Sequence, residues 1–210
     1  MKLGINPKVL TVIVVVGIVS ASTTYVIADY LNRGKVEDVK VKYEHILLKV
    51  SDEAKKFADN LSLALTCLDT ARDDLQKALY YTSLSNFSLL NSRYREAKQR
   101  GEAAFYYFNL SYAEFESSLE HILEIGQYPH GKDLISIYVN YTESAIMLSK
   151  LGKYLCENLS KAAEYYIQGL SDEGNKTLSI YTNLKKTFND QMNQLDVCIL
   201  QIKNYHGIRK

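Results

Sequence analysis

The sequence predicts an all-α protein, in which an N-terminal transmembrane helix is followed by an elongated antiparallel, up-down-up-down four-helix bundle. Two observations lead to this fold class. Residues 9–28 include no charged side chain, and about 20 apolar residues suffice for a helix to cross the hydrocarbon core of a bilayer. After them, apolar residues recur at alternating steps of three and four along four long segments, which is the heptad pattern of packed helices.

The apolar segment divides the N-terminus into a short tail, residues 1–8, and a transmembrane anchor helix, residues 9–30. A cleaved secretory signal is the alternative, because Lys2 and Lys8 precede the run and the small residues 20–22 resemble a cleavage site. The run continues past that site, whereas the apolar core of a signal peptide usually has only about 7–15 residues. We therefore expect a retained signal-anchor rather than a cleaved signal or a buried soluble helix.

The N-terminal residues also form a short motif. Lys2 and Gly4-Ile5-x-Pro7 precede an aliphatic run that starts at Val9, while Leu3 and Lys8 depart from the pattern described next. Residues 2–28 resemble the signal and anchor helix of archaeal type IV pilin-like secreted proteins. The resemblance implies that a dedicated peptidase cuts before the helix, and that the helix then anchors the subunit or packs into a filament core.

The first helix of the bundle is expected at about residues 35–82. Its heptad positions alternate leucine with alanine, as at Leu68, Ala71, Leu75 and Ala78, and small residues let a neighbouring helix approach closely. We expect this helix to end in the polar run 82–86, because Ser and Asn side chains compete with the helix backbone for hydrogen bonds and favour caps.

Three more helices are expected at about residues 87–125, 132–169 and 176–205, so that the bundle covers residues 35–206. Residues 126–131 contain two glycines and a proline, and residues 171–175 are polar with one glycine, which marks turns. The second helix is expected to begin its core stripe with Phe87 and Leu90. Gly101 and Gly152 fall on core positions of the second and third helices, where we expect close helix contacts. A helical-repeat solenoid is the alternative fold, although no 34-residue period occurs.

Composition and motifs exclude several classes of function. The chain has 25 basic and 24 acidic residues, a net charge of +1, whereas nucleic-acid binders show a basic excess or stripe. No phosphate-binding glycine loop, nucleophile elbow, H-E-x-x-H or C-x-x-C motif occurs. The four histidines, His45, His121, His130 and His206, are scattered. We predict no catalytic, cofactor-binding or metal-binding residue, no cofactor and no nucleic-acid partner.

Six N-x-[ST] sequons are the most informative motif, about three times the number expected by chance from this composition. Their asparagines all lie off the predicted core positions: Asn60, Asn86, Asn109, Asn140, Asn158 and Asn175. Asn86 and Asn175 are expected at turns far from the membrane, where a glycan meets least hindrance. Sequons would place the bundle outside the cell. The alternative is that Asn, Ser and Thr are polar filler on exposed helix faces.

The three cysteines are far apart in the sequence. Cys67 and Cys156 are the one candidate disulfide pair, because only they would lie at a common level in the bundle, while Cys198 would lie elsewhere. Their helices would be diagonal to each other in the bundle, however. The distance between the two Cα atoms would then exceed the separation that a disulfide allows. We favour the alternative of three small buried residues.

Tyrosine is abundant, with 17 residues, and three adjacent pairs stand out as a candidate contact surface: Tyr80, Tyr81, Tyr106, Tyr107, Tyr165 and Tyr166. Two neighbouring residues of a helix cannot both face the core, so one of each pair should lie near the surface. Exposed tyrosine is enriched in protein interfaces, while tyrosines that cap the edge of the core are the alternative.

Together these features favour a structural or interaction protein: a single-pass membrane-anchored, N-glycosylated cell-surface bundle with its C-terminal domain outside the membrane. The flanking charges leave the orientation open, since basic residues lie on both sides of the anchor, and the sequons decide it. The expected partner is another protein, a surface layer or a second copy. A pilin-like filament subunit with a helical head and an extracytoplasmic ligand-sensing bundle are the alternatives, and an enzyme is the least favoured.

Overall fold

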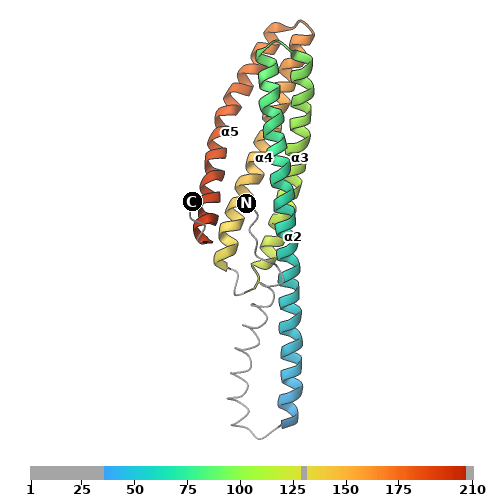
Figure 1. Cartoon of the computed structure of the whole chain (residues 1–210), viewed down its shortest axis with the longest axis vertical. Helices are drawn as coiled ribbons and strands as arrows, with labels where there is room; N and C mark the ends of the chain where they lie inside the picture. Colours follow the sequence, from blue (N-terminus) through green and yellow to red (C-terminus); the bar gives the residue numbers. More distant parts are fainter. Residues whose placement is uncertain (1–35, 129–131, 207–210) are drawn as a thin grey trace. The chain divides into compact units, whose positions relative to one another are not determined.

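The computed structural model describes residues 36–128 and 132–206. These residues form four α-helices and short turns, with no β-strand among them, so the predicted all-α class is confirmed for this part of the chain. In the labels of Figure 1 the helices are α2 (Val36–Leu90), α3 (Tyr94–Ile125), α4 (Lys132–Ile167) and α5 (Ser171–Tyr205).

The chain divides into two compact units, Met1–Ser62 and Leu63–Lys210. The described part of the first unit is helical and belongs to the N-terminal part of α2. The second unit holds the C-terminal part of α2 together with α3, α4 and α5, and every contact described below lies within it.

The helices of the second unit pack as an antiparallel bundle. Ser85 on α2 pairs with Ala97 at the start of α3, whereas Ala64 pairs with Ser118 near its end, so the two helices run in opposite directions. Further hydrogen bonds join α3 to α4, α4 to α5, and α5 back to α2: Ser111 with Ser149, Gln191 with Ser144, and Tyr181 with Asn86.

The core contains most of the positions that the heptad spacing predicts. In α2 the buried stripe consists of the alternating residues Ala64, Leu68, Ala71, Leu75 and Ala78. Large side chains of α3 and α4 are fully buried as well, and they include Phe108, Phe115, Leu148, Leu155 and Leu159. A mixture of small and large buried residues lets helix backbones approach while the interior stays filled.

Gly101 and Gly152 are buried contact points, as predicted. A Cβ atom on Gly152 would collide with the ring of Phe108, and one on Gly101 would collide with the hydroxyl of Ser160. Both glycines therefore mark places where the surface of one helix is occupied by a side chain from another.

The predicted first turn is wrong. Helix α2 runs through the polar segment 82–86 and ends at Leu90, and the turn consists of residues 91–93. The predicted core residues Phe87 and Leu90 are 54% and 75% exposed, whereas Ser85 is fully buried. The chain reverses direction at Ser92, whose φ is 57°.

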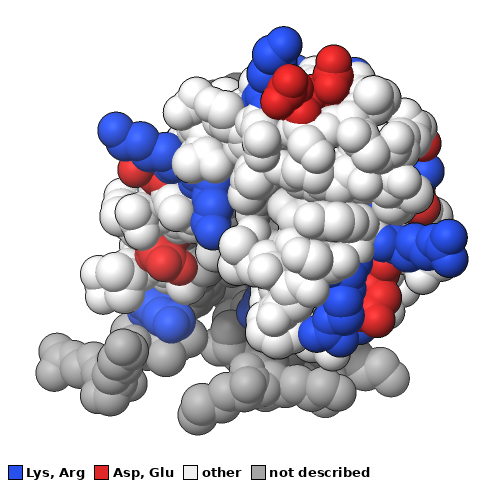
Figure 2. All heavy atoms as spheres, turned by 90° about the horizontal axis from the view of Figure 1, so that it is seen from above, with Lys and Arg blue, Asp and Glu red and all other residues white. Residues whose placement is uncertain are grey.

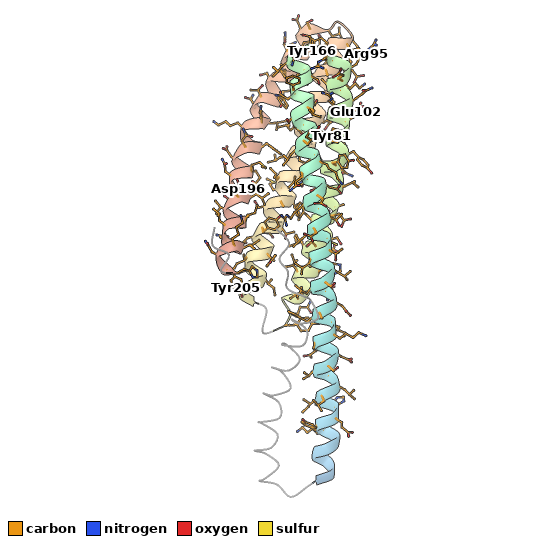
Figure 3. The ribbon with its side chains drawn as sticks, in the orientation of Figure 1. Tyr81, Arg95, Glu102, Tyr166, Asp196 and Tyr205 are labelled. Atoms are coloured by element: carbon orange, nitrogen blue, oxygen red, sulfur yellow. The ribbon has the colours of Figure 1, made fainter. Side chains whose placement is uncertain are left out.

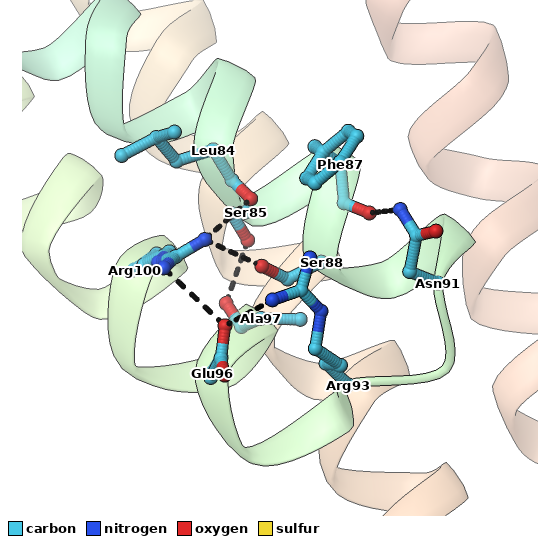
Figure 4. A network of polar contacts seen from close by, with 9 residues as sticks. All are labelled: Leu84, Ser85, Phe87, Ser88, Asn91, Arg93, Glu96, Ala97 and Arg100. Carbon is cyan, nitrogen blue, oxygen red and sulfur yellow. Dashed lines mark hydrogen bonds and ion pairs between the residues drawn. The ribbon is translucent and has the colours of Figure 1, made fainter.

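The reason is that tertiary contacts satisfy the polar side chains of this segment (Figure 4). Ser85 Oγ donates a 2.6 Å hydrogen bond to the carbonyl of Ala97, and Ser88 Oγ accepts a 2.7 Å hydrogen bond from Arg100. Thr82 donates to the carbonyl of Ala78, four residues earlier, and also contacts Cys156 Sγ on α4. The hydroxyls of Ser85 and Ser88 are engaged by residues of α3. They therefore do not compete for the backbone of their own helix, and the helix continues.

The other helix ends agree more closely with expectation. Helix α4 ends at Ile167, and the reversal lies at residues 168–170, where Gly169 has a φ of 76°. The segment 171–175, predicted as a turn, instead begins α5. Asp172 and Glu173 lie in the first turn of that helix, where negative side chains interact favourably with the helix dipole.

The predicted anchor, residues 9–30, lies outside the described residues, as do the tail before it and the candidate cleavage site. Among the helices that the structure describes, none has the length and apolar character that crossing a membrane requires.

Candidate interaction surface

Four of the predicted tyrosines form one continuous group across α2 and α3, which we call the tyrosine row: Tyr80, Tyr81, Tyr106 and Tyr107. The rings of Tyr81 and Tyr107 stack across the two helices, with centroids 5.6 Å apart and planes 6° from parallel. Tyr80 meets Tyr81 edge-on at 5.5 Å, and Tyr106 meets Tyr107 edge-on at 5.4 Å. Offset-stacked and edge-to-face rings at such distances attract one another.

The row has an inner and an outer pair. Tyr81 and Tyr107 are half-buried where the helices meet, whereas Tyr80 and Tyr106 are 61% and 58% exposed. Each adjacent pair thus places one ring near the surface, as the helical geometry requires. The two outer rings rest against the inner rings and leave an aromatic surface facing the solvent.

A lysine adds charge beside the row. Lys77 Nζ lies 5.3 Å from the centroid of the Tyr107 ring and 2.9 Å from a carboxylate oxygen of Asp74. The hydrogen bond to Asp74 raises the pKa of the Lys77 ammonium group above its ordinary value. The cation is therefore held over the aromatic face, where it is attracted by the ring electrons.

The third predicted pair does not join the row. Tyr166 stacks on Tyr94, with centroids 4.9 Å apart, and donates a 2.7 Å hydrogen bond to Asn175 Oδ1. Figure 3 shows Tyr166 at the end of the bundle near the turns and Tyr81 further along it. Tyr165 and Tyr166 are both partly buried, so this pair lies at the edge of the core.

A second aromatic group lies between α3 and α4 and was not singled out from the sequence. Lys153 Nζ lies 5.8 Å from the ring centroid of Phe105 and 5.1 Å from that of Tyr112, and it donates a 2.7 Å hydrogen bond to Asn109. The three α3 residues are spaced four and three apart, which is a visible signal of one helix face. The lysine comes from another helix, so only the packing identifies it.

Charges on the visible end of the second unit are mixed. Figure 2 views the end that carries the turns at residues 91–93 and 168–170, and acidic and basic side chains alternate around a largely uncharged face. The nearby ion pairs, such as Lys98 with Glu164 at 3.1 Å, are partly exposed, and exposed pairs of this kind contribute little to stability.

All six sequon asparagines lie within helices. Asn109, Asn140 and Asn175 are exposed, whereas Asn60, Asn86 and Asn158 are partly buried. The prediction that Asn86 lies at a turn is wrong, because α2 continues past it and Asn86 Oδ1 accepts a hydrogen bond of 3.2 Å from Tyr181. Asn175 lies near the start of α5, close to the turn where it was expected.

The three cysteines are free, so the candidate disulfide between Cys67 and Cys156 is absent. Cys156 contacts Thr82, which lies 15 residues after Cys67 on the same helix and therefore ~22 Å along it. The longer α2 has moved Cys67 away from the level that the predicted turn assigned to it. Cys156 and Cys198 are buried, while Cys67 is partly exposed.

An open groove of about 470 Å³ lies between α4 and α5. Its lining is mostly polar, with Ser144, Gln191 and Gln194 among the lining residues, which also include Cys198. Small-molecule sites are usually more enclosed and more apolar than this. Among residues 36–128 and 132–206, no three His, Cys, Asp or Glu side chains are placed to hold a metal ion.

One of the four histidines joins two helices. His206, in the last described residues, lies 3.1 Å from the hydroxyl of Tyr138 through its Nε2, which joins the C-terminal end of α5 to the N-terminal part of α4. His121 belongs to α3, and His130 lies outside the described residues.

No protein-family model matches this chain, and no curated protein or solved structure shows significant similarity to it.

Proposed function

We propose that this protein is a single-pass membrane-anchored, N-glycosylated helical bundle on the cell surface, where it acts as a structural or interaction module. The tyrosine row is the observation that carries the interaction part of the proposal. Tyr80 and Tyr106 expose large aromatic surfaces and are held by Tyr81 and Tyr107. Little conformational entropy would be lost when such rings are buried by a partner, which is one reason why tyrosine is enriched in interfaces.

Two further parts of the proposal, the membrane anchor and the location of the bundle outside the cell, rest on the sequence. The uncharged segment 9–28 is the motivation for the anchor, and the six sequons are the motivation for placing the bundle outside. The partner in this proposal is a protein, a surface layer or a second copy of the chain. A pilin-like filament subunit is the second candidate, favoured by Gly4-Ile5-x-Pro7 before the aliphatic run.

Intact-mass measurement of the natively purified protein separates these two candidates. A filament subunit processed before its helix lacks the residues up to about Pro7, whereas an anchored module keeps them. The same spectrum reports any glycan, because each attached sugar chain adds its own mass.

Accessibility in intact cells tests the sidedness. Protease added outside should cut the bundle at the turn 91–93 without membrane permeabilisation. The opposite result is a bundle that stays protected until the membrane is broken and whose six sequon asparagines are unmodified. The protein would then be a cytosolic adaptor held to the membrane, and the proposal of a surface protein would be abandoned.

Site-specific photocrosslinking tests the tyrosine row. A benzoylphenylalanine placed at Tyr80 or Tyr106 should give a discrete crosslinked product in intact cells, because these rings would face the partner. The matched control is the same probe at Tyr154, which is 50% exposed on α4 and outside the row. Equal crosslinking at all three positions, or none at any, would contradict a specific interface.

A further inference from the structure

The hydroxyl residues of five sequons are sealed inside the bundle. Relative exposure is 0% for Ser88, Ser111 and Thr142 and 8% for Thr177. In the fifth sequon, the hydroxyl oxygen of Ser160 is buried. The matching asparagines, which lie two residues earlier in each case, are exposed or partly exposed: Asn86, Asn109, Asn140, Asn158 and Asn175.

Helix geometry produces this division. An α-helix has 3.6 residues per turn, so the side chains of residues two apart point about 200° away from each other. A sequon inside a helix therefore cannot present its asparagine and its hydroxyl on one face. When such a helix packs into a bundle with its asparagine outside, the hydroxyl must point into the core.

Four of the five sealed hydroxyls also have hydrogen-bond partners, whereas the buried Ser160 Oγ has none. Ser111 shares a 3.1 Å hydrogen bond with Ser149 on α4, and Ser88 accepts one from Arg100. Thr142 and Thr177 each donate to the carbonyl four residues earlier, at 2.8 and 2.9 Å. An enzyme that must contact these hydroxyls could do so only after they had left the core and the helix had unwound.

We propose that glycan is added to these five asparagines before the bundle folds, and that folding then closes the sequons to the transferring enzyme. This inference rests on the proposed N-glycosylation. The donor class is a lipid-linked oligosaccharide phosphate. In the transfer, the asparagine Nδ2 forms a bond to the anomeric carbon of the sugar and loses one proton. The bond between that carbon and the phosphate oxygen breaks, and the lipid phosphate leaves with the electron pair.

The acceptor motif explains why burial matters. Transfer requires Ser or Thr at the second position after asparagine, so the enzyme must contact that hydroxyl. In the unfolded chain the backbone can bring the asparagine and the hydroxyl together. In the folded bundle five hydroxyls are inaccessible, and exposure of the asparagine alone does not make a substrate.

The test uses the full chain, produced without glycosylation and folded in detergent. It is incubated with a purified oligosaccharyltransferase and its lipid-linked donor, and site occupancy is measured by peptide mass spectrometry. Synthetic peptides that span each of the five sequons are incubated in parallel as unfolded substrates. A third sample is the folded chain with Arg93→Thr, which turns residues 91–93 into a sequon in the exposed turn.

Residues 91–93 are a matched control because all three are exposed and outside a helix. The Arg93 side chain makes only an exposed 3.5 Å ion pair with Glu96 and a contact with the Phe87 ring. The backbone hydrogen bonds of residue 93 to Ser88 and Ala97 do not depend on the side chain, so the replacement leaves the core intact, which circular dichroism verifies. We expect the peptides to be modified, the Arg93→Thr chain to be modified at Asn91, and the five native sites of the folded chain to be modified at least tenfold more slowly than their peptides.

Each other outcome has a distinct meaning. Native sites of the folded chain that react as fast as their peptides would overturn the inference and leave the proposed glycosylation intact. Peptides that are not modified, beside an Arg93→Thr chain that is, would overturn the proposed glycosylation itself. An Arg93→Thr chain that stays unmodified while the peptides react would show that the folded chain is refused even where the sequon hydroxyl is exposed. Hydroxyl burial would then not be the cause of the slow transfer, and the inference would be overturned in this form.

Discussion

At the scale of single residues, Gly152 is a sensitive point in the bundle. It is buried on α4, and a side chain there would collide with the ring of Phe108, which is itself fully buried. We expect Gly152→Leu to lower the free energy of unfolding by about 1–3 kcal/mol, because a packed interior accommodates extra methylene groups only with strain. Urea denaturation monitored by circular dichroism measures this change.

The matched control is Ala113→Leu at an exposed position of α3. It adds the same apolar side chain where space is available, so its effect should stay within about 0.5 kcal/mol. Equal stability of the Gly152→Leu and wild-type proteins would show that the α3–α4 packing differs from that described.

Buried ionisable groups predict how stability changes with pH. Burial raises the pKa of Tyr141 from 10.0 to about 12, and burial raises the pKa of the Cys156 thiol from 9.0 to about 12. In the unfolded chain both groups ionise at lower pH than in the bundle. Their contribution to stability is therefore complete below pH 9 and is lost as the pH rises from 9 toward 12.

Replacing Tyr141 isolates one part of this dependence. Tyr141→Phe removes the hydroxyl, so the fall of unfolding free energy between pH 10 and 12 should become shallower by up to about 1.4 kcal/mol per pH unit. Urea midpoints measured from pH 8.5 to 11.5 report the slope. Tyr154→Phe, at a ring that is 50% exposed, should leave the slope unchanged; an identical effect of both replacements would contradict burial as the cause.

At the scale of elements, the position of the first turn has a direct biochemical consequence. The segment 82–86 is helical and partly buried, whereas Arg93 is exposed in the turn that follows α2. We expect limited trypsin digestion of the folded protein to cut first after Arg93. Arg93→Gln should remove that cleavage, and early chymotryptic cleavage after Leu84 would indicate that α2 ends where the sequence alone predicted.

The geometry of the same turn offers a stability test. Ser92 has a φ of 57°, a conformation in which glycine avoids the strain of a side chain. Ser92→Gly should raise the unfolding free energy by about 0.5–1 kcal/mol. Ser83→Gly, at an exposed position within α2, should lower it by about 0.5–1 kcal/mol. The same Ser→Gly replacement should thus change the unfolding free energy in opposite directions at the two positions, which distinguishes a turn from a helix interior. Thermal unfolding measures both changes.

At the scale of the whole molecule, the bundle should fold without the N-terminal segment. The core residues of α2 to α5 contact one another within the unit Leu63–Lys210, so their apolar stripes need no lipid. We expect a protein of residues 36–210 to be soluble and strongly helical by circular dichroism. An insoluble or largely unstructured product would show that the stripes depend on the membrane or a partner.

Much of the fold follows from local spacing. The alternating pattern of Leu68, Ala71, Leu75 and Ala78 identifies a buried helix face, and glycine on the core register at positions 101 and 152 identifies close contacts. These predictions succeed because a helix turns by 3.6 residues whatever lies beside it. The end of α2 does not follow from such spacing, because the residues that cap or extend a helix respond to neighbours far away in the sequence.

Local patterns in the sequence predict the helical class of the described residues, their antiparallel order and most of their core, since periodicity and turn residues are local properties. The roles of the polar residues, in contrast, follow from the packing of the helices against one another. Ser85 extends α2 because it bonds to Ala97 on α3, and two tyrosine pairs form one row because α2 and α3 place Tyr81 against Tyr107. Five sequon hydroxyls lie in the core for the same reason: a helix has two faces, and packing selects the one that is buried.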